Sequence, residues 1–180
     1  HSWKVDGLEA LLAPLALNLW RAPTDNDVQI VDEWLLDGLN RTKAHPESIE
    51  ILADNDLPEV MVHGVLAADG YKPHSRYEIR YTFNPTGGCQ VHLAFTPLNL
   101  LTRLPRLGFM TRLHQTYERV AWFGRGPHES YPDRKDSALV DLYESKITDL
   151  FHPYINPQEN GNRSDVRWLR ITSPKLPTFV

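Results

Sequence analysis

Alternation of apolar and polar residues at every second position is the feature that most limits how this chain can fold. Apolar side chains occupy every second position of residues 77–83, and the same pattern returns in residues 89–95. Successive side chains of a strand point to opposite faces of a sheet, so the pattern predicts two half-buried strands. Between them, residues 84–88 read Asn-Pro-Thr-Gly-Gly, with Pro early in a turn and Gly where a positive φ is needed. Together the three segments predict a β-hairpin.

Besides this hairpin, the sequence predicts one helix and several further strands. A single helix is predicted, over residues 29–40, because its apolar positions recur at helical spacing, and Asp27 or Asp32 is expected to cap its start. Many short strands with one early helix predict an all-β sandwich or barrel, and we expect one domain over residues 1–180. The other strands are predicted over residues 48–53, 59–68, 119–124 and 166–171, with an extended segment over 106–117.

Charge and composition exclude several classes of function. The formal net charge is −4 and the basic residues are scattered, so no nucleic-acid-binding surface is predicted. No apolar run approaches the roughly 20 residues that a membrane-spanning helix needs. Cys89 is the single cysteine, which excludes an intrachain disulfide framework and a cysteine-based zinc site, and a cytoplasmic location is expected. The eight histidines include no close ligand pair, so no metal site is predicted.

Residues 122–134 form the segment richest in chemically useful side chains. His128 and Glu129 are candidates for a general acid/base pair, since a loop held by Gly and Pro is where catalytic groups tend to lie. Adjacent residues of an extended segment point to opposite sides, however, so these two side chains are not expected to serve one reacting atom. The favoured interpretation is a rigid corner held by charge-assisted hydrogen bonds and aromatic packing, and its members are Trp122, Phe123, Arg125, Glu129, Asp133 and Arg134.

Residues 18–27 contain three consecutive carboxylate or amide side chains, Asp25, Asn26 and Asp27. A calcium loop would need alternate ligand spacing and a distal acidic ligand, and neither is present. The favoured interpretation is a turn that leads to the cap of the predicted helix.

Residues 151–168 combine planar polar groups with aromatic rings. Such side chains can bind sugar hydroxyls and stack on sugar faces, or they can contact a partner domain. The same groups can also satisfy the backbone of a long loop, and both interpretations stay open. The candidates are Tyr154, Gln158, Glu159, Asn160, Asn162 and Arg163.

Three of these segments together resemble the C-terminal β domain of glycoside hydrolase family 2 β-galactosidases, which some bacteria encode as a separate small chain. They are LWRAPTDND at 19–27, WFGRGPHESYPDRKDSALVDLY at 122–143 and PYINPQENGNRSDVRWL at 153–169, and LPRLG at 104–108 fits the same pattern. The segments come in the family's order and cover most of the chain. The resemblance implies an antiparallel supersandwich of the galactose mutarotase-like type.

The resemblance also implies a division of labour. The catalytic glutamates of this family lie in a (β/α)8 barrel, and a retaining glycosidase needs two carboxylates about 5 to 5.5 Å apart. No barrel is encoded here, so the chain alone is expected to be inactive and to support the catalytic large chain or barrel domain in an oligomer. Mg and Na are implied in other domains of such enzymes, and no cofactor is expected in this chain. Because it begins without Met, we expect a fragment of a larger C-terminal domain.

Two other functions stay open. A free-standing carbohydrate-binding module could use the aromatic rings of Trp3, Trp34, Tyr154 and Trp168, although Trp34 fits a core position better. A sugar epimerase of the mutarotase type could use His128 and Glu129.

Overall fold

The computed structural model describes residues 3–5, 7–52, 57–99 and 103–180, and it divides into two compact units. Unit 1 comprises residues 1–15, 22–25 and 110–180, and unit 2 comprises residues 16–21 and 26–109. The regular secondary structure of both is mainly strands in antiparallel sheets, which confirms the predicted all-β class. The prediction of one domain over residues 1–180 stays a prediction. No helix in the described ranges is long and apolar enough to cross a membrane.

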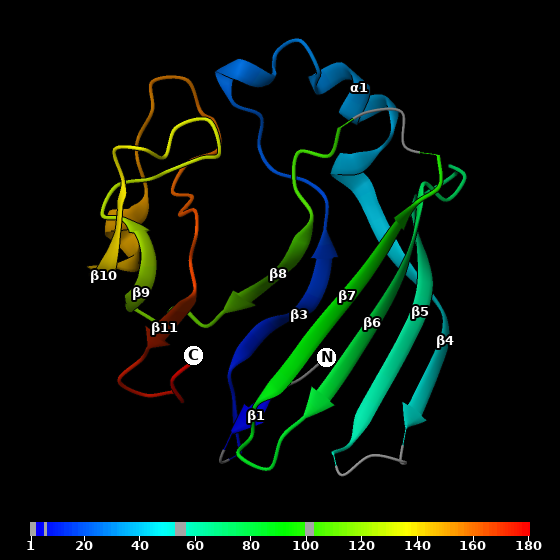
Figure 1. Ribbon diagram of the computed structural model, residues 1–180, viewed down its shortest axis with the longest axis horizontal. Helices are drawn as coiled ribbons and strands as arrows, with labels where there is room; N and C mark the ends of the chain where they lie inside the picture. Colours follow the sequence, from blue (N-terminus) through cyan, green and yellow to red (C-terminus); the bar gives the residue numbers. More distant parts are fainter. Residues whose placement is uncertain (1–2, 6, 53–56, 100–102) are drawn as a thin grey trace. The chain divides into compact units, whose positions relative to one another are not determined.

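Unit 2 is built on a four-stranded antiparallel sheet (Figure 1). The predicted hairpin is confirmed, since the strands Ser75–Phe83 and Cys89–Pro97 pair along their whole length, from Ser75↔Pro97 to Phe83↔Cys89. The strand predicted over 59–68 is also confirmed. The one predicted over 48–53 begins earlier, at Thr42, and runs to Leu52, and its last predicted residue, 53, lies outside the described residues. In sheet order the strands are β4 (Thr42–Leu52), β5 (Glu59–Ala68), β6 (Ser75–Phe83) and β7 (Cys89–Pro97).

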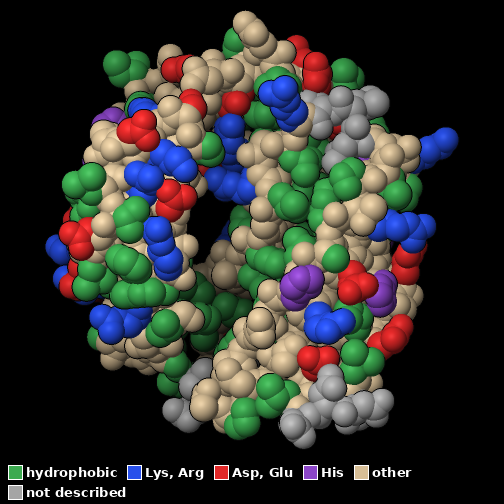
Figure 2. All heavy atoms as spheres, viewed as in Figure 1, with side chains coloured by type: hydrophobic (Ala, Val, Ile, Leu, Met, Phe, Trp, Pro, Cys, Tyr) green, Lys and Arg blue, Asp and Glu red, His purple; other side chains and the backbone are tan. Residues whose placement is uncertain are grey.

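The two faces of this sheet differ in polarity. Val62, Ile79 and Leu93 are aligned across three strands on one face, where they pack with the buried Trp34 and Leu39. The opposite face carries charged and histidine side chains, which gather over the sheet in Figure 2. Those aligned there include His63, Glu78, Arg80 and His92.

The helix of unit 2 is shorter than the predicted segment. α1 (Val31–Leu36) is followed by Gly38 in the left-handed region, at φ 73°, and then by a 3₁₀ turn, η2 (Leu39–Arg41). Glycine at this position commonly ends a helix, which explains the early stop. The predicted cap is wrong, because Ile30 occupies the N-cap without a side-chain cap and Asp27 instead receives two hydrogen bonds from Arg21, at 2.5 and 3.0 Å.

Unit 1 contains a three-stranded antiparallel sheet in the order β10-β9-β11 and a short hairpin of β1 (Lys4–Val5) and β2 (Leu8–Glu9). The strands predicted over 119–124 and 166–171 are confirmed as β9 and β11. The edge strand β10 was not predicted. The elements are β9 (Arg119–Gly126), β10 (Leu139–Lys146), the 3₁₀ turn η3 (Ile147–Leu150) and β11 (Trp168–Thr172).

Two further strands carry the chain from one unit to the other. β3 (Leu11–Asn18) pairs with β8 (Gly108–Leu113), the latter within the predicted extended segment 106–117. Within unit 1 the Thr111 hydroxyl donates to the Ala13 carbonyl at 2.7 Å. The long connection from β9 to β10 and the loop after η3 position the candidate site.

Candidate functional site

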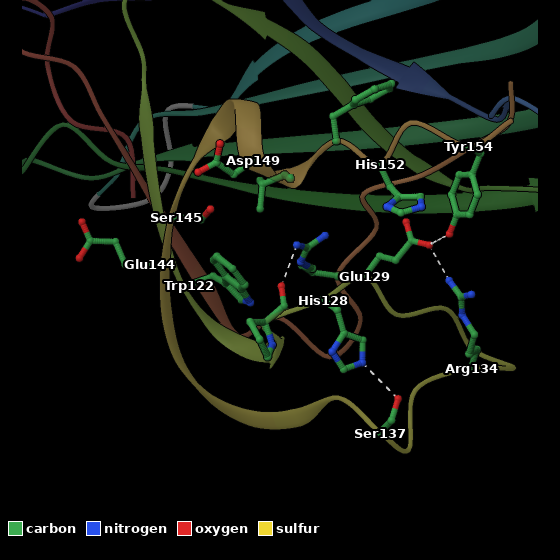
Figure 3. A pocket seen from close by; sticks show the side chains of 14 residues that line it. Trp122, His128, Glu129, Arg134, Ser137, Glu144, Ser145, Asp149, His152 and Tyr154 are labelled. Carbon is green, nitrogen blue, oxygen red and sulfur yellow. Dashed lines mark hydrogen bonds and ion pairs between the residues drawn. The ribbon is translucent and has the colours of Figure 1, made fainter.

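A cavity of about 700 Å³ lies in unit 1 between the β9–β10 connection and the loop that follows η3 (Figure 3). Trp122 of β9 lines it, as do residues of the β9–β10 connection, of β10 and of η3. The loop after η3 completes the lining with Phe151, His152, Tyr154 and Arg163. Two segments that the sequence analysis singled out separately, 122–134 and 151–168, therefore form one site.

Glu129 stands between these two segments. The Tyr154 hydroxyl and the Arg134 guanidinium (2.5 Å) both donate to Oε1, and the Gly161 backbone N–H donates to Oε2 at 2.9 Å. Burial raises the pKa of Glu129, but hydrogen bonds from Tyr154, Gly161 and Arg134 outweigh that effect and hold the pKa below its usual value. The carboxylate is thus ionised and shared among donors from both loops.

His128 also lines the cavity, next to Glu129 in the chain. Residues 127–130 lie outside any strand, so strand alternation does not decide where these two side chains point. Their partners nevertheless differ, since the His128 Nε2 lies 3.1 Å from the Ser137 hydroxyl whereas Glu129 contacts Tyr154 (Figure 3). No hydrogen bond joins His128 to Glu129 among the described residues.

Arg163 and Trp122 form the inner wall of the cavity. The Arg163 guanidinium lies 5.4 Å from the centre of the Trp122 ring and donates to the carbonyls of Gly161 (2.9 Å) and Pro127 (2.8 Å). Burial lowers the pKa of Arg163, and the nearby Glu129 partly offsets this. Trp122 is only 3% exposed and its indole N–H donates to the Arg125 carbonyl at 3.0 Å. The guanidinium therefore joins the two loops over an aromatic base.

Arg125 holds the β9–β10 connection closed. Its Nη1 donates to the carbonyls of Lys135 and Ala138, both at 2.9 Å, and its Nε donates to the Asp165 carboxylate at 2.5 Å. The hydrogen bond from Arg125 lowers the pKa of Asp165, and the nearby Lys135 adds to that effect. Asp133 is different from the expectation: its side chain is exposed at a turn tip and has no polar partner among the described residues. Asp165 takes the place expected for Asp133 because the loop after η3 brings it to Arg125.

Ser130 is a residue that the sequence analysis missed. It is fully buried, and its backbone forms two hydrogen bonds with Asn162 of the loop after η3. The Ser130 N–H donates to the Asn162 carbonyl at 2.8 Å, and the Ser130 carbonyl accepts from the Asn162 side-chain amide at 2.7 Å. Its hydroxyl accepts from the Ser164 N–H at 3.0 Å. A single serine gives no signal in a sequence, since its partners lie more than 30 positions away.

The remaining candidates of the second loop lie outside the cavity lining. Asn160 satisfies its own loop, because its side chain accepts from the His152 N–H at 3.1 Å and donates to the Gln158 carbonyl at 3.2 Å. The Glu159 N–H donates to the Pro23 carbonyl at 3.4 Å. Residues 22–25 belong to the segment 18–27 that the sequence analysis also singled out, and within unit 1 they therefore contact this loop as well.

Metal binding finds no support in the described part of the chain. It contains no group of three or more His, Cys, Asp or Glu side chains arranged to hold an ion. Asp25, Asn26 and Asp27 form a 3₁₀ turn, η1.

Comparison with known proteins gives consistent results. The sequence matches the family model described as beta galactosidase small chain over residues 1–179. It is 30% identical over 184 residues to a beta-galactosidase of Priestia megaterium, covering 99% of this chain and 17% of that protein. A Vibrio cholerae beta-galactosidase is 32% identical over 184 residues, covering 95% of this chain and 18% of that protein. One of Psychromonas ingrahamii is 34% identical over 178 residues, with 92% and 17% covered. The chain thus spans less than a fifth of the length of these relatives.

Proposed function

The chain belongs to the beta-galactosidase small chain family, and we propose that it acts as the small-chain or C-terminal β domain of a β-galactosidase. The observation that carries this proposal is the match over nearly the whole chain, to relatives of which it covers only 17% to 18%. The whole enzyme would hydrolyse terminal β-D-galactosides such as lactose, as a member of glycoside hydrolase family 2. The two units would then be parts of one supersandwich of the galactose mutarotase-like type.

The chemistry of the site supports a domain without its own catalytic pair. A glycosidase acid needs a carboxyl group whose pKa is raised, so that it holds a proton near neutral pH. The pKa of Glu129 is lowered instead, and its oxygens already accept from Tyr154, Arg134 and Gly161. The same arrangement speaks against a mutarotase-type epimerase that uses His128 and Glu129.

The partner proposed for this domain is the catalytic large chain or barrel domain, in an oligomeric enzyme. An apolar row on the unit 1 sheet supports it, since Leu142 and Trp168 both align with Phe123 of the middle strand. These side chains are 61%, 39% and 38% exposed, and exposed apolar rows are typical of protein interfaces. Mg and Na would be held by other domains of the enzyme.

The test is complementation. The isolated chain is assayed on a chromogenic β-galactoside, alone and then with a β-galactosidase that lacks this domain. We expect no turnover by the chain alone and restored turnover in the mixture. Leu142→Ser should weaken the restoration, whereas Leu107→Ser, at an exposed position of unit 2, serves as the matched control. Enzyme-like turnover by the isolated chain would contradict the proposal.

A free-standing carbohydrate-binding module is the second candidate, and the cavity of unit 1 is the observation that favours it. Trp34 is 3% exposed in the core of unit 2, so it cannot contribute to a sugar platform. Tyr154 lines the cavity.

A further inference from the structure

We propose that the cavity of unit 1 is a binding site for a neutral saccharide. This proposal deepens the second candidate function above, and it does not require the enzyme function because the cavity's own side chains carry it. Its volume of about 700 Å³ lies within the range of about 300 to 1,000 Å³ that is typical of small-molecule sites.

The wall formed by the loop after η3 offers aromatic surface. Phe151 is 66% exposed although it is large and apolar, and the rings of His152 and Tyr154 lie 4.3 Å apart in an edge-to-face arrangement. A sugar ring presents C–H groups on one face, and such a face packs on exposed aromatic rings. The wall therefore supplies the apolar half of a saccharide site.

The polar half comes from groups with unused hydrogen-bonding capacity. Within the described ranges the His152 imidazole has no hydrogen-bond partner, and the His128 ring uses only Nε2. One oxygen of Asp149 accepts from the Thr148 hydroxyl at 3.3 Å, and the other has no partner in the same ranges. A neutral imidazole offers both a donor and an acceptor, and a carboxylate offers acceptors, so the lining matches hydroxyl groups that donate and accept.

The charges of the lining favour an uncharged ligand. Glu129 pairs with Arg134 at 2.5 Å, and Glu144 pairs with Arg119 at 2.7 Å. This leaves one guanidinium, Arg163, and one carboxylate, Asp149, which balance each other. A phosphate or carboxylate ligand would meet no net positive charge in this cavity, whereas a neutral sugar would meet no penalty.

The wall is also held in place before any ligand arrives. Glu129 joins Tyr154 and Gly161 to the β9–β10 connection, and Arg163 joins the same connection through the Pro127 carbonyl. A preformed wall lowers the entropic cost of binding, so modest contacts suffice for measurable affinity.

The experiment is an NMR titration of the 180-residue chain with galactose, glucose and lactose, and separately with inorganic phosphate. The reporters are the ring signals of His128 and His152 and the indole N–H of Trp122. We expect these signals to shift with saccharide in the millimolar range and not with phosphate. No shift at high millimolar saccharide, or equal shifts with phosphate, would overturn the proposal.

Two variants locate the site. His152→Ala and Asp149→Asn should each weaken saccharide binding by about three- to tenfold, as expected for the loss of one hydrogen bond. The matched controls are His92→Ala on the exposed face of unit 2 and Asp133→Asn at the turn tip, which should bind like the wild type. Equal weakening by the controls would place binding elsewhere and overturn the proposal. The wild-type titration stands without the variants, and the complementation assay reports separately on the enzyme function.

Discussion

Glu129 illustrates how one carboxylate can hold two loops that are distant in the sequence. Its donors come from both sides, Arg134 from the β9–β10 connection and Tyr154 and Gly161 from the loop after η3. Its side chain is only 12% exposed, so loss of the carboxylate would leave the part-buried donors of Tyr154 and Gly161 without a full acceptor. The residue that looked like a catalytic base from its neighbours in the chain is better explained as an anchor.

Glu129→Gln should lower the free energy of unfolding by about 1 to 3 kcal/mol near pH 7, because the amide cannot accept from all three donors. The folded-state pKa of Glu129 lies below its unfolded value of about 4.5, so its contribution is complete above that value and is lost as the pH falls through the folded-state pKa. Denaturant unfolding at several pH values should therefore show the two proteins converging in acid. Glu50→Gln, at an exposed position of β4, is the control. A difference that stays constant into acid would contradict this account.

Arg125 and Asp133 should differ sharply in importance, although both belong to the same segment. Arg125→Ala should cost about 2 to 3 kcal/mol, because the carbonyls of Lys135 and Ala138 lose a charged donor. Asp133→Ala should change stability by less than about 0.5 kcal/mol, as is usual for exposed positions without partners. Thermal unfolding measures both, with Arg112→Ala on β8 as the control for the arginine. A large loss for Asp133→Ala would restore the role first expected of it.

Among the elements, β5 shows how close packing restricts a single position. Gly64 faces Tyr77 across the sheet, and β4 carries an irregularity between Pro46 and Ser48 at the same level. A Cβ at Gly64 would collide with the His45 carbonyl and lie 2.5 Å from the Tyr77 hydroxyl oxygen. Glycine at this position thus makes room for a buried tyrosine.

Gly64→Ala should destabilise the chain by about 1 to 3 kcal/mol, because an overpacked site must shift its backbone or the tyrosine ring. Gly108→Ala at the start of β8 is the matched control, since nothing lies within 4 Å of its added Cβ. Chemical denaturation measures both. Equal stability of the two variants would show that Tyr77 moves aside freely.

The elements also show which parts of the fold the sequence could predict. The hairpin of β6 and β7 was predictable because alternation and turn residues agree locally. β10 was not, because Leu139 and Val140 are consecutive apolar residues and both are exposed, which breaks the alternation. At the site, both loops were recognised by composition, but Ser130 and Asp165 depend on partners 30 to 40 positions away and no local pattern identifies them.

For the molecule as a whole, the path of the chain makes unit 2 nearly continuous in sequence. Apart from residues 22–25, it is the stretch 16–109, whereas unit 1 needs residues from both sides of it. All buried members of the Trp34 core, such as Leu19, Leu66 and Ile79, belong to that stretch.

A polypeptide of residues 16–109 should therefore fold by itself, because its core and its four-stranded sheet are complete. The edge-to-face pair of Trp20 and Trp34, at 6.1 Å, gives a near-ultraviolet circular dichroism signal that reports on this core. We expect a cooperative loss of that signal on heating. The matched comparison is residues 110–180, which lack the first strands of unit 1 and should not show such a transition. Absence of a transition in 16–109 would mean that the core depends on the rest of the chain.

The pairing of β3 with β8 has a consequence for protein engineering. The chain leaves unit 1 along β3 and returns to it along β8, so the two ends of the 16–109 stretch lie on hydrogen-bonded neighbours. Segments whose ends are adjacent in space can be replaced by a short turn or exchanged for another domain with little disturbance of the host. A reporter domain spliced between β3 and β8 would keep every residue that lines the cavity, but it would remove residues 22–25 of unit 1 and with them the Pro23 carbonyl that accepts from Glu159.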